Sequence, residues 1–139
     1  METSNETAIT TFNGQADKPY YCSVKANTQA EKIKLFNALE NADLRLNDCV
    51  DQVIAIKDVY VERYVKQENE TEKVKFRTIL FGEDGKTYVT ASYGVYNCMS
   101  KIFLAFGTPD NWTESLKVKV TKRDIGNGKQ ALNLTLVTE

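Results

Sequence analysis

The fold is decided by a stretch that begins VDQVIAIKDVYVERYVK at Val50–Lys66 and continues KVKFRTILFGEDGKTYVTAS at Lys73–Ser92. Both segments are rich in β-branched and aromatic residues, and the second carries the turn Gly82–Gly85 in its middle, as a hairpin requires. Two further β-rich runs, Leu116–Arg123 and Gln130–Thr138, are joined by a turn that contains Asn-Gly, a favoured hairpin pair. The sequence therefore predicts five strands.

A helix separates the third and fourth of these strands. Its apolar residues recur at helical spacing and form one stripe, which consists of Val95, Cys98, Met99, Ile102, Phe103 and Phe106. Gly107 ends the helix, and Pro109 prevents it from resuming. The order strand, strand, strand, helix, strand, strand is that of a five-stranded OB-fold barrel, so we expect a mainly β protein of this type.

A separate element precedes the barrel pattern. The segment TQAE at residues 28–31 has the form of a capping box, and Ile33, Phe36 and Leu39 follow at helical spacing. We therefore expect an additional N-terminal helix from about Gln29 to about Ala42, packed against the barrel.

The chain has 139 residues, enough for one domain with a proper hydrophobic core and too few for two. We expect residues 28–139 to form the barrel domain with its leading helix. Residues 1–27 then form an N-terminal arm or an extra strand, with the end Met1–Glu6 disordered. The apolar side chains of this segment are Ile9, Phe12, Tyr20, Tyr21 and Val24.

Charge and composition exclude several classes of function. The net charge is −1, so a site for a polyanion must be a local patch, and the last two strands are the cationic region. The chain has no histidine, which removes the commonest general base, the Ser-His-Asp and Cys-His arrangements and most zinc sites. No glycines form a GxGxxG or Walker-type phosphate loop. We expect neither an enzyme nor a cofactor nor a metal site.

The three cysteines share no CxxC spacing and are odd in number, so we expect them to be reduced core residues in a cytosol. The first 13 residues are polar and contain neither the apolar core of a signal peptide nor a membrane span. The sequence therefore predicts a cytoplasmic protein without a membrane partner.

Aromatic and basic residues alternate on the strand faces that the pattern turns outward. In the first strand the apolar parity switches after Ile56, as a bulge in a closing barrel would cause. The same reasoning in the next two strands gives one set of outward residues: Tyr60, Tyr64, Lys75, Arg77, Lys86 and Tyr88. Unpaired bases stack on aromatic rings at about 1–3 kcal/mol per base, while Lys and Arg contact phosphates. This pattern predicts a surface for single-stranded nucleic acid.

The fourth strand alternates cleanly, with apolar residues inward and lysines outward, and it leads into a basic hairpin. This hairpin lies at the place of the loop that often closes over the bound strand in OB proteins. Trp112 lies in the loop after the helix, and the sequence allows two roles for it, capping the barrel end and stacking on a base. Tyr93 and Tyr96 are expected to border the core. The further candidates for binding are thus Trp112, Lys119, Lys122, Arg123 and Lys129.

Several short motifs, taken together, resemble a known family. They are LFNA at 35–38, LND at 46–48, ILFGEDGKTY at 79–88, ASYGV at 91–95, FGTP at 106–109 and LKVKV at 116–120. In these motifs the chain is similar to the small single-stranded DNA-binding proteins of phages and mobile elements of Gram-positive bacteria. The resemblance covers roughly residues 27–137 and implies an OB fold, sequence-tolerant binding of single-stranded DNA, no cofactor and no catalysis.

Two functions remain open. The first is a non-catalytic protein that coats and protects single-stranded DNA during replication, in the host cytoplasm if the gene belongs to a phage. Replication proteins and further copies of the chain are then partners to consider. The second is an OB-like module that binds another protein, such as a phage inhibitor of a host enzyme, which the near-neutral charge favours slightly. The outward aromatic and basic residues and the resemblance favour the first.

Overall fold

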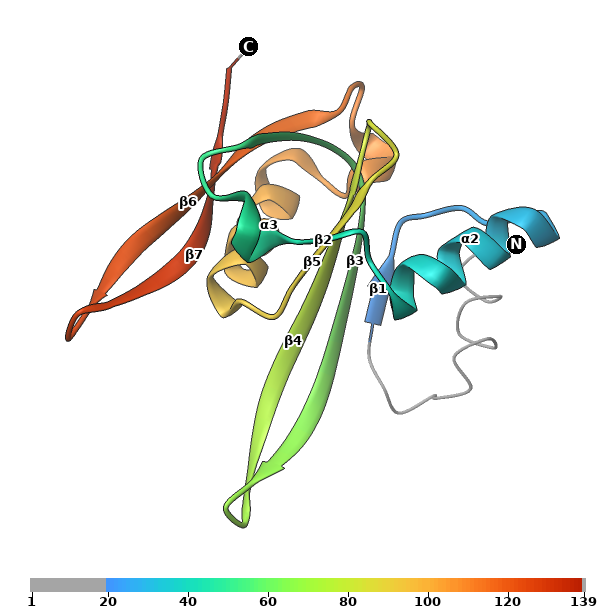
Figure 1. Ribbon diagram of the computed structural model, residues 1–139. Helices are drawn as coiled ribbons and strands as arrows, with labels where there is room; N and C mark the ends of the chain where they lie inside the picture. Colours follow the sequence, from blue (N-terminus) through green and yellow to red (C-terminus); the bar gives the residue numbers. More distant parts are fainter. Residues whose placement is uncertain (1–19, 139) are drawn as a thin grey trace.

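The computed structural model describes residues 20–138 as one curled sheet with two α-helices (Figure 1). The helices are α2 (Gln29–Glu40) and α3 (Tyr93–Phe106), and short 3-10 helices lie at Leu46–Cys49 and Pro109–Asn111. The strands are β1 (Tyr20–Cys22), β2 (Leu44–Arg45), β3 (Val53–Glu68), β4 (Thr71–Gly82), β5 (Thr87–Thr90), β6 (Leu116–Gly126) and β7 (Lys129–Leu136). The protein is mainly β, as predicted.

Strand β3 is the centre of the sheet, whose order is β2-β5-β4-β3-β6-β7. One edge of β3 pairs with β4, and the other pairs first with β6, at Val53–Ile56, and then with β1, at residues 60–62. The register of the β3–β4 pair shifts between Ile56 and Asp58. This bulge is the parity switch that the sequence predicted, and it bends β3 where its partner changes from β6 to β1.

The sheet curls into a half-barrel that stays open among the described residues. Strand β5 pairs with β4 and with the short parallel strand β2, whereas β7 pairs with β6. Helix α3 lies between β4 and β7 (Figure 1). Ser92 Oγ, at its N-cap, donates to the carbonyl oxygen of Leu132 (3.2 Å), and a Cβ on Gly94 would collide with the same oxygen. The helix therefore covers the edge of β7.

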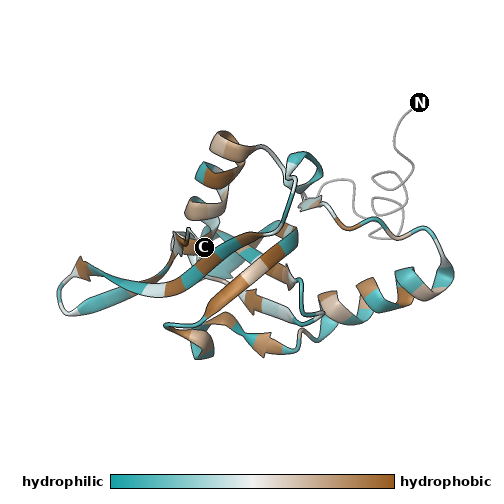
Figure 2. Cartoon of the chain, turned by 90° about the horizontal axis from the view of Figure 1, so that it is seen from above, coloured by the Kyte–Doolittle hydropathy of each residue, from teal (hydrophilic) through white to brown (hydrophobic). Residues whose placement is uncertain are grey.

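The main core lies between the concave face of the sheet and α3. Val95, Met99 and Ile102 of the predicted stripe are buried, Cys98 and Phe103 are half-buried, and Gly107 ends the helix with a φ of 82°. Phe106, at the end of the stripe, is exposed. Figure 2 shows hydrophobic residues gathered on the strands around α3 and a largely hydrophilic outer part of the β6–β7 ribbon. The three cysteines are free.

Helix α2 begins at the predicted capping box. Glu31 N donates to Thr28 Oγ1 (3.1 Å), and Thr28 N donates to Glu31 Oε1 (3.0 Å). The face that it buries differs from the prediction, because Leu35, rather than Ile33 or Phe36, is its buried residue and packs with Ala26, Leu39 and Phe81. Ile33 and Phe36 are 52% and 44% exposed.

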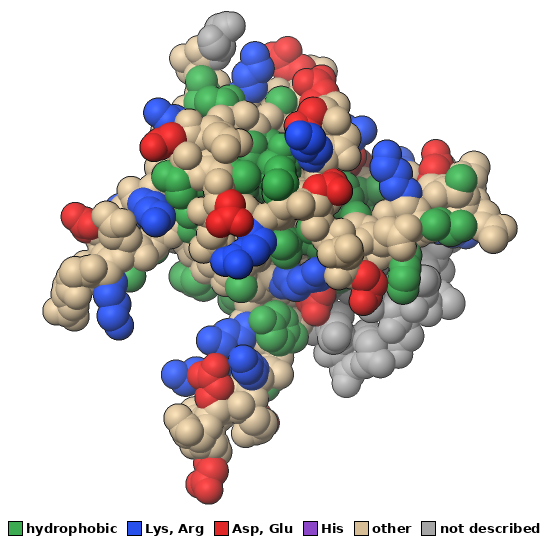
Figure 3. All heavy atoms as spheres, viewed as in Figure 1, with side chains coloured by type: hydrophobic (Ala, Val, Ile, Leu, Met, Phe, Trp, Pro, Cys, Tyr) green, Lys and Arg blue, Asp and Glu red, His purple; other side chains and the backbone are tan. Residues whose placement is uncertain are grey.

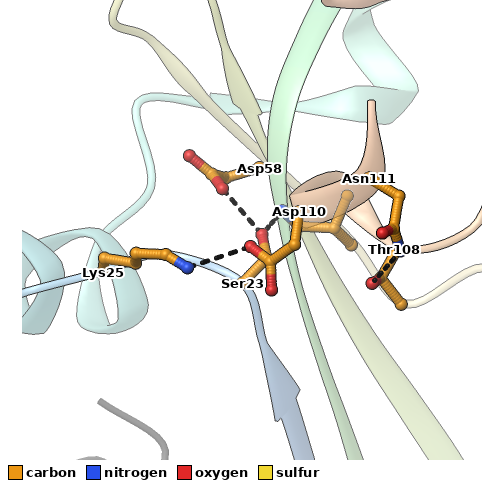
Figure 4. A network of polar contacts seen from close by, with 7 residues as sticks. Ser23, Lys25, Asp58, Thr108, Asp110 and Asn111 are labelled. Atoms are coloured by element: carbon orange, nitrogen blue, oxygen red, sulfur yellow. Dashed lines mark hydrogen bonds and ion pairs between the residues drawn. The ribbon is translucent and has the colours of Figure 1, made fainter. Parts of the chain in front are cut away.

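Strand β1 supplies an extra strand in the N-terminal segment, and a polar network fixes the chain that follows it (Figure 4). Ser23 Oγ donates to Asp58 Oδ1 (2.8 Å) and accepts from Val59 N (2.9 Å), while Lys25 Nζ lies 3.1 Å from Asp110 Oδ1. Burial raises the pKa of Asp58 above its usual range. The expected disorder of residues 1–6 and the side chains of Ile9 and Phe12 lie outside the described residues.

Candidate nucleic-acid interface

Two of the three tyrosines predicted for stacking are buried, so their predicted outward orientation is wrong. Tyr88 is 5% exposed in the main core, and its hydroxyl donates to Asp84 Oδ2 (3.1 Å). Tyr60 is 3% exposed, and its hydroxyl donates to Glu62 Oε1 (3.0 Å). Burial raises the pKa of Tyr60, and burial followed by the Asp84 contact raises the pKa of Tyr88 to about 12.

The physical reason is that both faces of the central strands are covered. Tyr88 faces α3 and the concave core. The face that carries Tyr60 and Glu62 meets the end of α2, since Arg77, the cross-strand neighbour of Glu62, donates to the Leu39 carbonyl oxygen (2.5 Å). Alternation along a strand identifies the inner face only where the outer face meets water.

Three of the other predicted residues, Tyr64, Lys75 and Arg77, lie on one face of the β3–β4 ribbon, and Lys86 lies apart from them. Arg77 lies 3.9 Å from Glu62, and Lys75 lies 3.6 Å from Glu68. Tyr64, opposite Lys75, is half-buried. Lys86 is exposed at the other end of β4, in the turn to β5. The predicted face thus keeps one half-buried tyrosine, Tyr64, and two cations that already have acidic neighbours.

Trp112 closes one end of the core. Its half-buried indole packs against the main core, and Nε1 donates to the carbonyl oxygen of Gly107 (2.8 Å). The side chain thus has the contacts of a residue that caps the barrel end, one of the two roles that the sequence left open.

Aromatic side chains gather instead where α3 begins beside β4. The rings of Phe76 and Tyr96 are stacked, with centroids 3.8 Å apart and an interplanar angle of 14°. Tyr93 lies 5.8 Å from Tyr96 and 6.0 Å from Phe76, and it is 64% exposed. We call Phe76, Tyr93 and Tyr96 the aromatic cluster. The expectation that Tyr93 borders the core is therefore wrong, although the i, i+3 spacing of Tyr93 and Tyr96 could have indicated a shared helix face.

A groove of about 400 Å³ adjoins the aromatic cluster between α3 and the β3–β4 pair. Its lining includes the stacked pair Phe76–Tyr96 and a second pair, Tyr21–Phe103. The rings of Tyr21 and Phe103 are T-shaped, with centroids 5.5 Å apart and an interplanar angle of 65°. Arg63, the cross-strand neighbour of Phe76, also lines it and is exposed. Aromatic faces beside a guanidinium group suit the stacking of unpaired bases.

The β6–β7 ribbon brings one of its cations, Lys122, near the start of α3. Lys122 is the cross-strand neighbour of Leu132, whose carbonyl oxygen accepts from Ser92, the residue before Tyr93. Lys122, Arg123 and Lys129 are exposed, and none of them forms an ion pair within residues 20–138. Figure 3 shows Lys and Arg side chains along both the β3–β4 and the β6–β7 ribbons.

The alternation predicted for β6 is confirmed. Val118 and Val120 are fully buried, while Lys117 and Lys119 are exposed. The predicted turn is also present, as a two-residue loop at Asn127-Gly128 with φ values of 55° and 72°.

Within residues 20–138, no three or more Cys, Asp and Glu side chains are grouped so that they could hold a metal ion. Among the helices of the same range, none has the length and apolar character needed to cross a membrane.

Comparison with known proteins gives one match. The model of the Phi29-type family described as phage single-stranded DNA-binding protein matches residues 3–137, which include the aromatic cluster, the groove and both ribbons. No curated protein and no solved structure matches the chain. The family match covers far more than half of the sequence and confirms the resemblance drawn from the short motifs. The chain therefore belongs to the phage single-stranded DNA-binding protein family.

Proposed function

We propose that the protein binds single-stranded DNA without sequence preference and so protects the intermediates of phage replication. In this proposal unpaired bases stack on the aromatic cluster, while Arg63 and the cations of the β6–β7 ribbon contact the phosphates. The observation that carries the proposal is Tyr93, a ring that is 64% exposed beside a stacked aromatic pair. Arg63, opposite Phe76, and Lys122, opposite Leu132, form no ion pair in the described part of the chain.

We infer further that the sheet is of the OB type. Support comes from the order β3, β4, β5, α3, β6, β7 and from the pairing of β3 with both β4 and β6. The proposed site lies where β4 leaves the barrel beside α3, rather than on the outer face of the central strands, because α2 meets that face. The domain, residues 28–139, then carries the site, and the N-terminal segment, residues 1–27, contributes Tyr21.

The proposal calls for neither a cofactor nor a catalytic group, since stacking and ionic contacts are sufficient for this kind of binding. Single-stranded phage DNA arises in the host cytoplasm during replication, which is therefore the location that we expect. Replication proteins and further copies of the chain are the proposed protein partners.

The substitution Tyr93→Ala tests the proposal directly. We expect it to weaken binding of a labelled dT oligonucleotide by about 1–3 kcal/mol, roughly 5- to 150-fold, because a stacking surface is lost. The melting temperature should barely change, since the side chain is largely exposed. Fluorescence anisotropy gives the affinity and circular dichroism the stability.

Tyr64→Ala is the matched control, because Tyr64 lies on the opposite face of the same ribbon from Arg63 and Phe76. It should leave the affinity almost unchanged. Loss of binding in Tyr64→Ala but not in Tyr93→Ala would move the site to the face that the sequence predicted. Equal affinity of the wild-type protein for duplex DNA would remove the stacking mechanism altogether.

A further inference from the structure

A second hollow, also of about 400 Å³, lies between α2, the β4–β5 turn and the segment that follows β1. We call it the lysine cleft because four lysines line it: Lys25, Lys34, Lys57 and Lys86. They come from four different parts of the chain, so the fold, rather than a basic run in the sequence, brings them together. No short motif in the sequence indicates this site.

The acidic residues of the lysine cleft are already occupied by internal partners. Glu31 accepts from the backbone N–H groups of Asn27 (2.8 Å) and Thr28 (3.0 Å) at the start of α2. Asp58 accepts from Ser23, and Asp110 pairs with Lys25, as Figure 4 shows.

Three of the four lysines remain available to a ligand. Lys34, Lys57 and Lys86 are exposed and form no ion pair among residues 20–138. The lining of the cleft holds four lysines against three carboxylates, those of Glu31, Asp58 and Asp110, so it carries an excess of one positive charge. Exposed ammonium groups in such a setting are the chemistry of a phosphate contact.

The lysine cleft and the aromatic groove both border the segment that begins with β1. Tyr21 lines the groove and Ser23 lines the cleft, two residues further along the same extended segment. An extended chain rises about 3.3 Å per residue, so the two linings are separated by roughly 7 Å along this segment. One strand of DNA that follows this segment could therefore contact both hollows.

We propose that the lysine cleft binds phosphates of the same single strand of DNA whose bases stack in the aromatic groove. This inference rests on the proposed function and deepens it, because it extends the footprint of the DNA from the β6–β7 ribbon to α2. Short oligonucleotides then occupy the aromatic cluster and groove alone. Longer ones also fill the cleft.

The test compares two double variants on oligonucleotides of different length. Lys34→Ala with Lys86→Ala removes one lysine from each side of the cleft. The control, Lys32→Ala with Lys66→Ala, makes the same change in net charge with exposed lysines that line neither hollow. Affinities for dT6 and dT20 are measured by anisotropy between 0.05 and 0.5 M salt, and circular dichroism confirms that each variant is folded.

We expect the cleft variant to bind dT20 roughly tenfold more weakly at low salt and to lose about 1.4 from the salt slope, since each single-strand phosphate contributes about 0.7. Its affinity for dT6 should match that of the wild-type protein. An equal loss for dT6 and dT20, or an equal loss in the control variant, would overturn the inference.

The outcome also separates this inference from the proposed function. If wild-type protein binds dT20 and Tyr93→Ala weakens it, while the cleft variant binds as the wild type does, the proposed function stands and the lysine cleft is not part of the DNA site. A cleft that serves an acidic protein partner would give this result. If the wild-type protein does not bind dT20, the proposed function itself fails.

Discussion

Tyr88 brings a hydroxyl group into the core and keeps it hydrogen-bonded. The ring belongs to the main cluster under α3, while the hydroxyl reaches Asp84 in the β4–β5 turn. We expect Tyr88→Ala to lower the free energy of unfolding by about 3–5 kcal/mol, as other aromatic truncations in cores do. Tyr88→Phe should cost only about 0.5–1.5 kcal/mol, because it removes the hydrogen bond and keeps the ring. Urea denaturation measures both, and a fully stable Tyr88→Ala protein would contradict the buried position.

The pH dependence of Tyr88→Phe provides an independent check. The hydroxyl ionises near 10 in the unfolded chain, whereas burial and the Asp84 contact raise its pKa to about 12 in the folded protein. A raised pKa contributes stability that is present below pH 10 and is lost as the pH rises through about 12. Tyr88→Phe should therefore lose less stability than the wild-type protein over this interval.

The same residue explains why part of the site could not be predicted. Thr87 and Tyr88 are adjacent in β5 and both are buried, so alternation along the strand carries no information about which side chain meets water. Tyr93 was expected to border the core and is exposed. It lies in an apolar helix, and only the packing of α3 between β4 and β7 leaves its ring exposed beside Phe76.

Among the elements, the β3–β4 ribbon has an unusual turn. Asn69 and Glu70 form a two-residue loop between Glu68 and Thr71, with φ values of 50° and 66°. Such a turn suits Asn and Gly, whereas the Cβ of a glutamate is strained at positive φ. We expect Glu70→Gly to stabilise the protein by up to about 1 kcal/mol, measured by urea denaturation.

The variant Glu70→Ala is the control for this prediction. It removes the same charge but keeps a Cβ in the strained conformation, so it should give no gain. An equal effect of Gly and Ala would assign the change to the charge of Glu70 and not to the backbone.

Elements defined by local chemistry were predictable from the sequence. The capping box of α2, the apolar stripe of α3 and the Asn127-Gly128 turn each depend on residues within a few positions of one another. The bulge after Ile56 was predictable for a similar reason, because the parity of apolar residues changes within one strand. The buried face of α2 was not, since it depends on contacts with Ala26 and Phe81.

At the scale of the whole molecule, two ribbons extend from the curled sheet with α3 between them (Figure 1). Arg63 approaches the aromatic cluster from the β3–β4 ribbon, and Lys122 approaches it from the β6–β7 ribbon. The sequence predicted cations and aromatic residues on exposed strands, yet their combination depends on which strands become neighbours. That arrangement is set by long-range pairing, which local patterns do not specify.

The β6–β7 ribbon should therefore act through charge alone. We expect replacement of Lys122, Arg123 and Lys129 together by Ala to weaken binding about equally for dT, dC and dA oligonucleotides, because phosphate contacts carry no base information. The slope of log affinity against log salt should fall by about 2, since three single-strand contacts contribute about 0.7 each. Stability should change by less than about 0.5 kcal/mol per residue, because all three side chains are exposed.

A matched triple variant, in which Lys32, Arg45 and Lys66 are replaced by Ala, separates local contacts from net charge. These three side chains are exposed, lie outside the β6–β7 ribbon and line neither hollow, and the change in charge is the same. If the ribbon contacts DNA, only the first variant shows the smaller slope of log affinity against log salt, and its residual binding still depends on Tyr93. If the slope falls equally in both variants, the effect belongs to the overall charge of the protein, and the ribbon is not part of the site.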